Sequence, residues 1–329
     1  MTKYASPYCE KEAAPACKLC GGCNLMHLEY GEQLRMKRDK LQGLMKHDAG
    51  VYEAAAQFGY RNRMQFHSDG PITGLMAKKE SRIIPIDECP IADKGINKWL
   101  KEEKEGKKEI NTINERTRFT VYSKDDCFLQ EGDGKTANIS LLGKHFMMNA
   151  GVFFQSNSEM FEKLLKKTID IAEEAISSTK AIRNMPAADF YCGVGVFGAF
   201  LQDFFPSVEL FESAPESANF ALQNLDGTKT KVWNLSDIAW ADMQRNNPEK
   251  ARRFGLIVAD PPRNGLARPL VNWLCVHGPA VFIYVSCNPA SLARDAASLC
   301  KSGYSLQSLE LFDFYPQTSH IESLAVFKK

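Results

Sequence analysis

The sequence lacks the long apolar runs that mark membrane-spanning segments. No stretch of about 18 consecutive apolar residues occurs in it. The first residues, from Met1 to Ser6, also contain no apolar core of a secretory signal peptide. These two absences predict a cytoplasmic protein that has no membrane partner.

An excess of charge of either sign is also missing, as are internal repeats and low-complexity tracts. The 41 Lys and Arg residues balance 40 Asp and Glu residues, which gives a formal net charge of +1. A nucleic-acid substrate would therefore have to be held by local basic surface, because the chain as a whole does not attract a polyanion. The 329 residues, 44% of them apolar, predict a globular protein of two domains, and we expect a monomer.

Cysteine, by contrast, is abundant and unevenly placed, with ten residues in all. Four of them crowd the N-terminus, and one more stands alone before the middle of the chain: Cys9, Cys17, Cys20, Cys23 and Cys89. A secreted disulfide scaffold would be shorter and would carry a signal sequence. Clustered cysteines in a cytoplasmic chain therefore indicate a metal or iron–sulfur site first.

The hydrophobic pattern changes near residue 150, where we place a domain boundary. Residues 24–46 have a helical pattern, and strand-like runs at 82–86, 119–122 and 138–142 predict that domain 1–150 is a β-rich α+β domain. Domain 151–329 begins with a linking helix at 157–178. Strand and helix candidates then alternate, which predicts an α/β fold with a doubly wound, mostly parallel, Rossmann-like sheet. These candidates are 186–191, 199–205, 208–212, 214–226, 255–260, 267–276, 280–286, 289–301 and 305–313.

A glycine-rich turn follows the first strand of this alternation. In Tyr191-Cys192-Gly193-Val194-Gly195 the two glycines would let the backbone approach a ligand at a helix N-terminus. A carboxylate at the end of the next strand, Glu212, is placed to accept the hydroxyls of a ribose. Nicotinamide dinucleotides and S-adenosylmethionine both use this layout, and a plain tight turn with a surface Glu is the simpler alternative.

The stretch Asp260-Pro261-Pro262-Arg263 favours S-adenosylmethionine over a nicotinamide dinucleotide. It follows a buried strand pattern at 254–259, at the edge where open α/β sheets bind ligands. An acidic residue followed by two prolines makes a rigid shelf beside a cofactor, which a simple turn at the end of a strand rarely needs.

A thiol and a carboxylate complete the pattern. Cys287 ends a strand-like run and precedes Asn288-Pro289, which opens a helix, so we expect the helix N-terminus to lower the pKa of the thiol. Glu322 alternates with Thr318 and His320, which would place all three on one side of a strand. Methylation of a pyrimidine at C5 needs a Cys nucleophile and a base at one site. A buried structural Cys and a solvated strand edge are the alternatives when each is taken alone.

Together these segments resemble the RNA uracil-5-methyltransferase family, which uses S-adenosylmethionine to make 5-methyluridine in tRNA and rRNA. The resemblance spans nearly the whole chain, through the motifs CGGCNLMH, YRNRM, ECPI, FFQSN, FYCGVGVFG, DPPRNG, SCNPASLARD and PQTSHIE. It implies a class I methyltransferase domain in which Cys287 is the nucleophile and Glu322 the base. It also implies a cofactor site formed by Gln155, Tyr191, Gly193, Gly195, Val196, Glu212, Asn234 and Asp260.

Members of the family with this N-terminal pattern bind a [4Fe–4S] cluster through four cysteines. The resemblance therefore implies an iron–sulfur site in the first domain. Cys20, Cys23 and Cys89 match directly. Cys17 would be the fourth ligand, with C-x2-C-x2-C spacing, and Cys9 is the alternative to it. A zinc site is the plainer possibility.

The RNA partner is expected to contact basic residues near these cysteines through its phosphates, with ordinary surface charge as the alternative. These residues are Arg35, Lys37, Arg38, Lys40, Arg61 and Arg63. From the residues before Cys9 we expect the chain to lack the small β-barrel RNA-binding domain with which many relatives begin. The family members that lack one include enzymes acting on large-subunit (23S) rRNA, so we expect rRNA rather than tRNA.

Four other hypotheses remain at this stage. One is a tRNA enzyme of the same chemistry. A second is a catalytically idle iron–sulfur paralogue that binds RNA, against which the presence of both Cys287 and Glu322 argues. A DNA cytosine methyltransferase would carry its nucleophile in a Pro-Cys pair nearer the glycine turn. An amino-group methyltransferase would carry an aromatic residue where this chain has Arg263.

Overall fold

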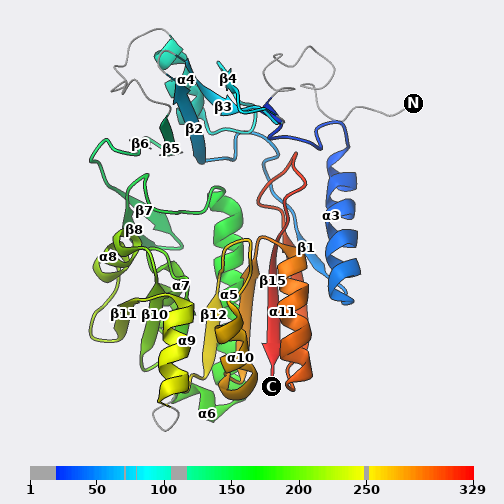
Figure 1. Ribbon diagram of the computed structural model, residues 1–329, viewed down its shortest axis with the longest axis vertical. Helices are drawn as coiled ribbons and strands as arrows, with labels where there is room; N and C mark the ends of the chain where they lie inside the picture. The colour runs from blue at the N-terminus through cyan, green and yellow to red at the C-terminus, as the bar shows by residue number, and fades with distance from the viewer. Residues whose placement is uncertain (1–19, 70–71, 79, 105–116, 248–251) are drawn as a thin grey trace.

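The computed structural model describes residues 20–69, 72–78, 80–104, 117–247 and 252–329. In this part of the chain a large sheet lies between two layers of helices, and a smaller β-rich unit sits at one end of it (Figure 1). Cys9 and Cys17 lie outside the described residues.

The large sheet has eight strands in the order β1-β14-β15-β13-β12-β9-β10-β11. All neighbours pair in parallel except β15, which is antiparallel to both β13 and β14. The mostly parallel α/β sheet predicted from the alternation is thus confirmed. The strands are β1 (Gly50–Tyr52), β9 (Ala187–Phe190), β10 (Val208–Glu212), β11 (Thr230–Asn234), β12 (Leu256–Ala259), β13 (Val281–Ser286), β14 (Ser305–Phe312) and β15 (Glu322–Lys328).

Helices cover both faces of this sheet, and each face has its own apolar core. The central strands are therefore buried on both sides, which explains the apolar runs of β12 and β13. One face is covered by α5 (Ser158–Ser178), α7 (Val196–Leu201) and α8 (Pro215–Asn224), with the short α6 (Lys180–Arg183) after α5. The other is covered by α3 (Tyr30–Met45), α9 (Asp237–Asn246), α10 (Arg268–His277) and α11 (Pro289–Lys301).

Local sequence sets the ends of the two helices that flank the site. Asn157 caps α5, where its side chain accepts a hydrogen bond from the N–H of Met160 at 3.2 Å. Asn288 caps α11 in the same way through the N–H of Ala290, and Pro289 occupies the first helical position. Both caps fix where the preceding loop must lie.

The smaller unit is an antiparallel sheet in the order β4-β3-β2-β5-β6, with the helix α4 (Lys94–Lys104) packed on it. Phe66, Trp99 and Phe119 form the centre of its apolar core. Its strands are β2 (Arg63–Asp69), β3 (Ile72–Met76), β4 (Ile83–Pro85), β5 (Thr117–Lys124) and β6 (Cys127–Gln130). The hairpin β7 (Ala137–Leu141) and β8 (Lys144–Met148) packs against α8 instead.

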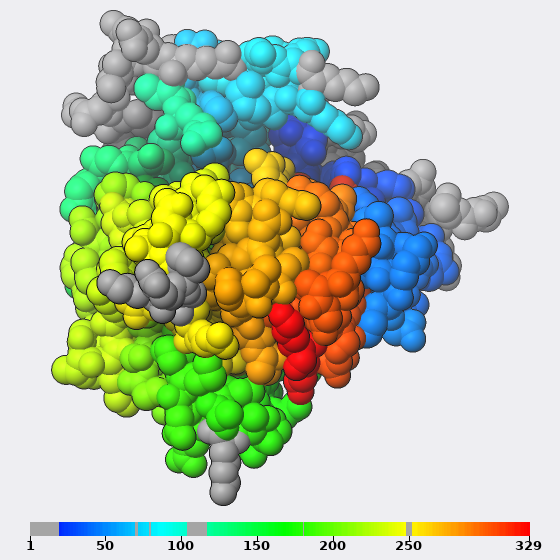
Figure 2. Space-filling view, turned by 60° about the horizontal axis from the view of Figure 1, so that its bottom comes forward, coloured from blue at the N-terminus to red at the C-terminus, as the bar shows by residue number. Residues whose placement is uncertain are grey.

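The segment at 30–52 crosses between the two parts of the molecule. Helix α3 packs against α11 (Figure 2), and β1 pairs with β14 at the edge of the large sheet. The boundary predicted near residue 150 stays a prediction, but these residues from its N-terminal side belong to the layers of the large sheet. Among the described residues, no helix is long and apolar enough to cross a membrane.

Candidate active site

A cavity of about 770 Å³ opens at the carboxyl ends of the parallel strands. The strand order reverses at β9, whose neighbours are β10 and β12, and open α/β sheets bind ligands at such a point. The cavity brings together most of the residues singled out from the sequence. These are Arg61, Gln155, Tyr191, Gly193, Glu212, Asp260, Cys287 and Glu322.

The glycine turn after β9 fixes the carboxylate of Glu212. Tyr191, Gly193 and Gly195 all have left-handed backbone conformations, with φ of 63°, 55° and 89°. The turn directs the N–H of Gly193 to Glu212 Oε2 at 2.9 Å, while the N–H of Ala214 donates to Oε1 at 2.7 Å. Glu212 is thereby held at the cavity wall with a defined orientation.

Three residues expected in the cofactor site, Gly195, Val196 and Asn234, do not line the cavity. A Cβ at Gly195 would meet the Leu225 side chain at 3.1 Å, so this glycine serves close packing as well as its positive φ. Val196 is buried at the start of α7. The amide of Asn234 donates to the carbonyls of Glu212 and Ser213, at 2.9 and 3.1 Å, and so supports the end of β10.

Asp237 also lines the cavity and was not found from the sequence. Its carboxylate accepts hydrogen bonds from the Tyr191 hydroxyl and from the N–H of Ala267, the latter at 3.1 Å. The local pattern shows only the start of α9, where Ser236 is the N-cap. The pairing with Tyr191, 46 residues away in the chain, is a tertiary contact that the pattern cannot reveal.

Two carboxyl groups and a thiol meet at the floor of the cavity. Burial raises the pKa of Asp260 to about 7. A hydrogen bond from Gln155 Nε2, at 3.3 Å, lowers this pKa but does not cancel the effect of burial. Burial and the nearby Asp260 raise the pKa of Glu322 well above its ordinary value. Among the described residues, Gln155 Oε1 and Glu322 Oε1 are buried with no hydrogen-bond partner. Such atoms fit a site that a polar ligand completes.

Cys287 lies between the end of β13 and the capped start of α11. Burial first, and then the carboxyl groups of Glu322 and Asp260, raise the pKa of the thiol to about 12, while Arg263 lowers it. The expectation of a lowered pKa was therefore wrong for the protein without ligands. Desolvation and two neighbouring acids outweigh the helix N-terminus. Asn288 also donates to the carbonyl of Arg263 at 2.9 Å, which ties this loop to the Asp-Pro-Pro-Arg shelf.

Glu322 is the first residue of β15 and is 2% exposed. The loop before it, residues 313–321, contributes Tyr315, His320 and Ile321 to the cavity. Thr318 is buried in this loop, and its hydroxyl donates to the carbonyl of Tyr315 at 2.9 Å. The expected strand at 318–322 is thus a loop up to residue 321, and Thr318 does not face the cavity.

Cys20, Cys23 and Cys89 line a second cavity of about 260 Å³. Asn97 clamps the backbone of Cys89 by hydrogen bonds to both its N–H and its carbonyl, at 2.8 and 3.0 Å. Within the described ranges, no group of three or more His, Cys, Asp or Glu is arranged as a metal site. The donor chemistry of three thiols around one cavity still fits a thiolate-bound group.

Arg61 lines both cavities and connects them. Its guanidinium lies 5.9 Å from the centre of the Tyr315 ring. Arg63 does not line either cavity; its guanidinium lies 5.4 Å from the centre of the Phe153 ring, and it donates to the carbonyl of Val152 at 3.3 Å. Phe153, which the sequence reasoning passed over, is 58% exposed at the mouth of the large cavity.

Known proteins resemble this chain over most of its length. The family model of the tRNA (uracil-5-)-methyltransferases matches residues 134–329. A protein of Treponema denticola described as an uncharacterized RNA methyltransferase is 31% identical, over 98% of this chain and 85% of its own. The tRNA (uracil(54)-C(5))-methyltransferase of Pyrococcus abyssi is 27% identical, over 94% of this chain and 85% of its own.

The fold also matches a solved structure. The crystal structure of Pyrococcus abyssi tRNA (uracil-54, C5)-methyltransferase in complex with S-adenosyl-L-homocysteine has a TM-score of 0.74 and 25% sequence identity. The match covers 93% of this chain and 86% of the other.

Proposed function

Because the chain belongs to the tRNA (uracil-5-)-methyltransferase family, we propose that it methylates C5 of a specific uridine in RNA through a covalent bond between Cys287 and C6. The methyl donor is S-adenosylmethionine. One observation carries this proposal: a single cavity holds the thiol of Cys287 and the carboxyl of Glu322 beside the glycine turn and Asp260. The proposal therefore assigns a nucleophile, a base and a place for the donor to one cavity, as methylation of a pyrimidine ring requires.

Carbon 5 of uracil is too weak a nucleophile to take a methyl group unaided. As a thiolate, Cys287 Sγ forms a bond to C6, and the electron pair of the C5–C6 double bond moves onto the ring as an enolate. S-adenosylmethionine, when bound, supplies the methyl group, which C5 takes as the sulfonium–methyl bond breaks. Glu322 then removes the C5 proton, the C5–C6 double bond forms again and the Sγ–C6 bond breaks. The thiolate returns, and one proton is released per methyl group.

The raised pKa values of Cys287 and Asp260 suit a cationic cofactor. In the free protein both groups favour their neutral forms, because burial penalises the charged ones. The pKa of Glu322 is raised in the same way. A positive charge beside these three groups lowers their pKa values, so the thiolate of Cys287 and the carboxylate of Glu322 that the reaction needs form when the site is loaded. Glu212, held by two backbone N–H groups, is oriented to accept the hydroxyls of a ribose. Gln155 Oε1 offers an acceptor to the same ligand.

RNA would approach from the side of the smaller unit, where Arg61 borders the cavity. The exposed ring of Phe153, backed by the guanidinium of Arg63, offers a face on which an unstacked base can lie. A uridine must leave its stack before its C6 meets Cys287. A phosphate contact through Arg61 and a base contact at Phe153 together would hold it there.

For the RNA itself we keep large-subunit rRNA as the expected substrate. The tRNA alternative is favoured by the name of the Pyrococcus abyssi relative, which acts on uracil 54 of tRNA. The expected cytoplasmic location and the monomeric state stay predictions.

A [4Fe–4S] cluster is part of the proposal for the second cavity. Cys20, Cys23 and Cys89 would be three of its ligands, with Cys17 or Cys9 as the fourth. When bound, the cluster would hold the segment 20–28, which we call the cysteine loop, to β2 and to the segment around Cys89. Zinc remains the alternative occupant.

One assay, run on two RNAs, tests the proposal. Purified protein is incubated with methyl-labelled S-adenosylmethionine and either rRNA or tRNA from a deletion strain, and 5-methyluridine is mapped by mass spectrometry. Label at C5 of one uridine in rRNA is expected. Label at a single tRNA uridine would show that the substrate is tRNA instead of rRNA. No label in either RNA would favour a catalytically idle RNA-binding paralogue.

A further inference from the structure

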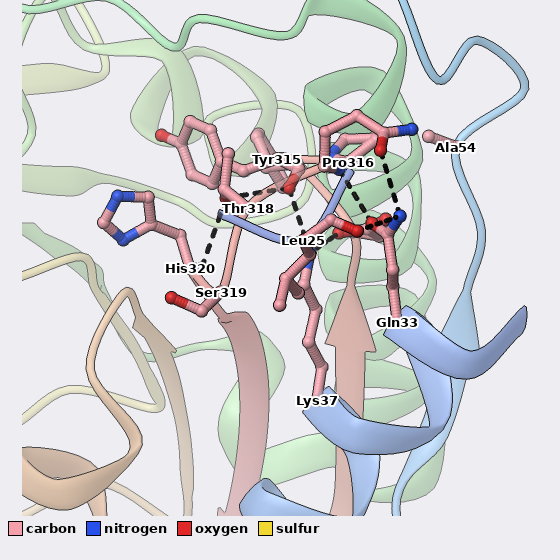
Figure 3. A network of polar contacts seen from close by, with 12 residues as sticks. Leu25, Gln33, Lys37, Ala54, Tyr315, Pro316, Thr318, Ser319 and His320 are labelled. Atoms are coloured by element: carbon pink, nitrogen blue, oxygen red, sulfur yellow. Dashed lines mark hydrogen bonds and ion pairs between the residues drawn. The ribbon is translucent and has the colours of Figure 1, made fainter. Parts of the chain in front are cut away.

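The loop that presents Glu322 is anchored by side chains far from it in the sequence. Gln33 and Lys37 reach from α3 to the turn around Tyr315 and Pro316, while His320 extends from the far side of the same loop (Figure 3). Loop 313–321 therefore packs against α3 on one side, and on the other side it contributes Tyr315, His320 and Ile321 to the lining of the large cavity. None of these α3 residues lines the cavity.

Gln33 is the centre of this contact and is 0% exposed. Its Oε1 accepts the N–H of Gln317 at 2.8 Å, and its Nε2 lies 3.0 Å from Gln317 Oε1. The same Nε2 lies 3.2 and 3.1 Å from the carbonyls of Leu25 and Leu28, in the segment that follows Cys23. One buried amide thus joins the cysteine loop to the loop of Glu322.

Gln317 needs this support because of its backbone. It has a φ of 69°, in the left-handed region that residues with a side chain rarely adopt. Its N–H, its carbonyl and its side chain are all bonded outside the loop, to Gln33 and, through the carbonyl, to the N–H of Leu25 at 3.0 Å. Such a conformation persists only where its surroundings determine it, and it sets the path of the four residues that lead to Glu322.

Two further contacts hold the same loop. Asn24, next to Cys23, exchanges hydrogen bonds with Ser319 in both directions, each at 2.8 Å. Lys37, which is 2% exposed, pairs with Asp313 at 2.5 Å and also donates to the carbonyl of Tyr315 at 2.9 Å. The expectation that Lys37 contacts RNA was therefore wrong, because its charge is buried against this loop. The cysteine loop and α3 therefore bind loop 313–321 at three places: Asp313, Gln317 and Ser319.

From this network we propose that Gln33 is a positioning residue for the base: it holds loop 313–321 so that Glu322 meets the C5 proton, and it links that geometry to the cysteine loop. The proposal rests on the proposed function. It predicts a larger defect in proton removal than in bond formation, because Cys287 is held by β13 and α11, whereas this loop leads directly into Glu322. Without Gln33 the methylated adduct forms at the normal rate but breaks down to product slowly.

The test replaces the amide without changing the size of the side chain. Gln33→Met removes every hydrogen bond of the amide and keeps a flexible apolar chain of similar length. Glu322→Gln is the benchmark, since it removes the base itself. Thr168→Val is the matched control, because it deletes a buried hydrogen bond in α5, from Oγ1 to the carbonyl of Leu164, away from the cavity. Asn24→Ala, at an exposed position, serves if Gln33→Met does not fold.

Each variant, as the full chain, is mixed with substrate RNA and methyl-labelled S-adenosylmethionine. Labelled protein–RNA complex that survives SDS is followed beside free methylated RNA. For Gln33→Met we expect a stoichiometric burst of methyl transfer and product release slower than in the wild type by about 10- to 100-fold. The labelled complex accumulates as in Glu322→Gln. Asn24→Ala shows the same pattern more weakly, and Thr168→Val behaves like the wild type.

The outcomes separate the two levels of the argument. If Glu322→Gln traps the complex while Gln33→Met and Asn24→Ala release product at the wild-type rate, the positioning role is wrong and the proposed function stands. Equal slowing of adduct formation and of release in these variants gives Gln33 a purely structural role and also overturns the inference. If Glu322→Gln itself releases product normally, the proposed function fails first.

Discussion

Replacing Asp260 by Asn is expected to stabilise the free protein at pH 8 and to abolish its affinity for S-adenosylmethionine. Burial raises the pKa of this carboxyl from 3.8 to about 7. In the unfolded chain the group ionises freely at its lower pKa, whereas the folded protein must either keep the proton or bury a charge. Asn has nearly the same shape and can still accept the hydrogen bond from Gln155.

The magnitude follows from linkage between folding and proton binding. Because the folded protein holds the proton more tightly, the wild type loses stability as the pH rises from about 4 to about 7. At about 1.4 kcal/mol per pH unit, the full rise in pKa corresponds to about 4 kcal/mol. The carboxyl borders the open cavity, which softens its desolvation, so we expect a gain in the range of about 2–4 kcal/mol for Asp260→Asn at pH 8.

Urea unfolding at a series of pH values measures this gain directly. The difference between Asp260→Asn and the wild type should shrink as the pH falls and vanish near pH 4. Asp226→Asn is the control: hydrogen bonds from Thr228 lower the pKa of that exposed carboxyl, so its removal should bring no gain at pH 8. Calorimetric titration of the same Asp260→Asn sample should detect no cofactor binding. A variant no more stable than the wild type at pH 8, or one that binds the cofactor normally, would refute the reasoning.

Three other predictions concern the thiols and the RNA. Iodoacetamide should modify Cys287 more slowly than the exposed Cys300, and the rate at Cys287 should still rise about tenfold per pH unit from pH 8 to 10, because the pKa of this thiol is raised to about 12. Glu322→Gln should speed the modification of Cys287. A rate at Cys287 that levels off near pH 9, followed by peptide mass spectrometry, would contradict this. Cys89→Ser should lose the ~400 nm absorbance of a cluster, whereas an unchanged spectrum and iron content would remove Cys89 from the ligands. Phe153→Ala should weaken RNA binding by about 1–3 kcal/mol in filter binding, and an unchanged affinity would exclude base stacking there.

Most of the large sheet could be predicted because its signals are local. Strands β12 and β13 are short apolar runs, each followed by a turn and a helical pattern. The bounds of β10 and α11 agree with the predicted ranges to the residue. Strand β11 and helix α9 were not among the strands and helices predicted from the alternating pattern. β11 lies at the sheet edge with half-exposed side chains, and α9 carries Ile238 on its exposed face. Neither therefore shows a clear apolar period.

The site was only partly predictable, for a different reason. The residue types of Cys287 and Glu322 indicated their chemistry, but their surroundings depend on strands that meet only after folding. The two carboxyl groups that raise the pKa of Cys287 lie 27 and 35 residues from it in the chain, and no local pattern brings them there. The pairing of β1 with β14 and the contact of Gln33 with Gln317 are likewise invisible in sequence, since they join segments more than 250 residues apart.

The most direct test of the central claim uses RNA in which the target uridine is 5-fluorouridine. Fluorine cannot leave as a proton does, so the methylated adduct stays on the protein. After incubation with S-adenosylmethionine and digestion, mass spectrometry should find one peptide, containing Cys287, that carries a methylated fluorouridine. The same experiment with Cys287→Ala should yield no adduct. An adduct on another residue, or full trapping by Cys287→Ala, would contradict the assignment of Cys287 as the nucleophile.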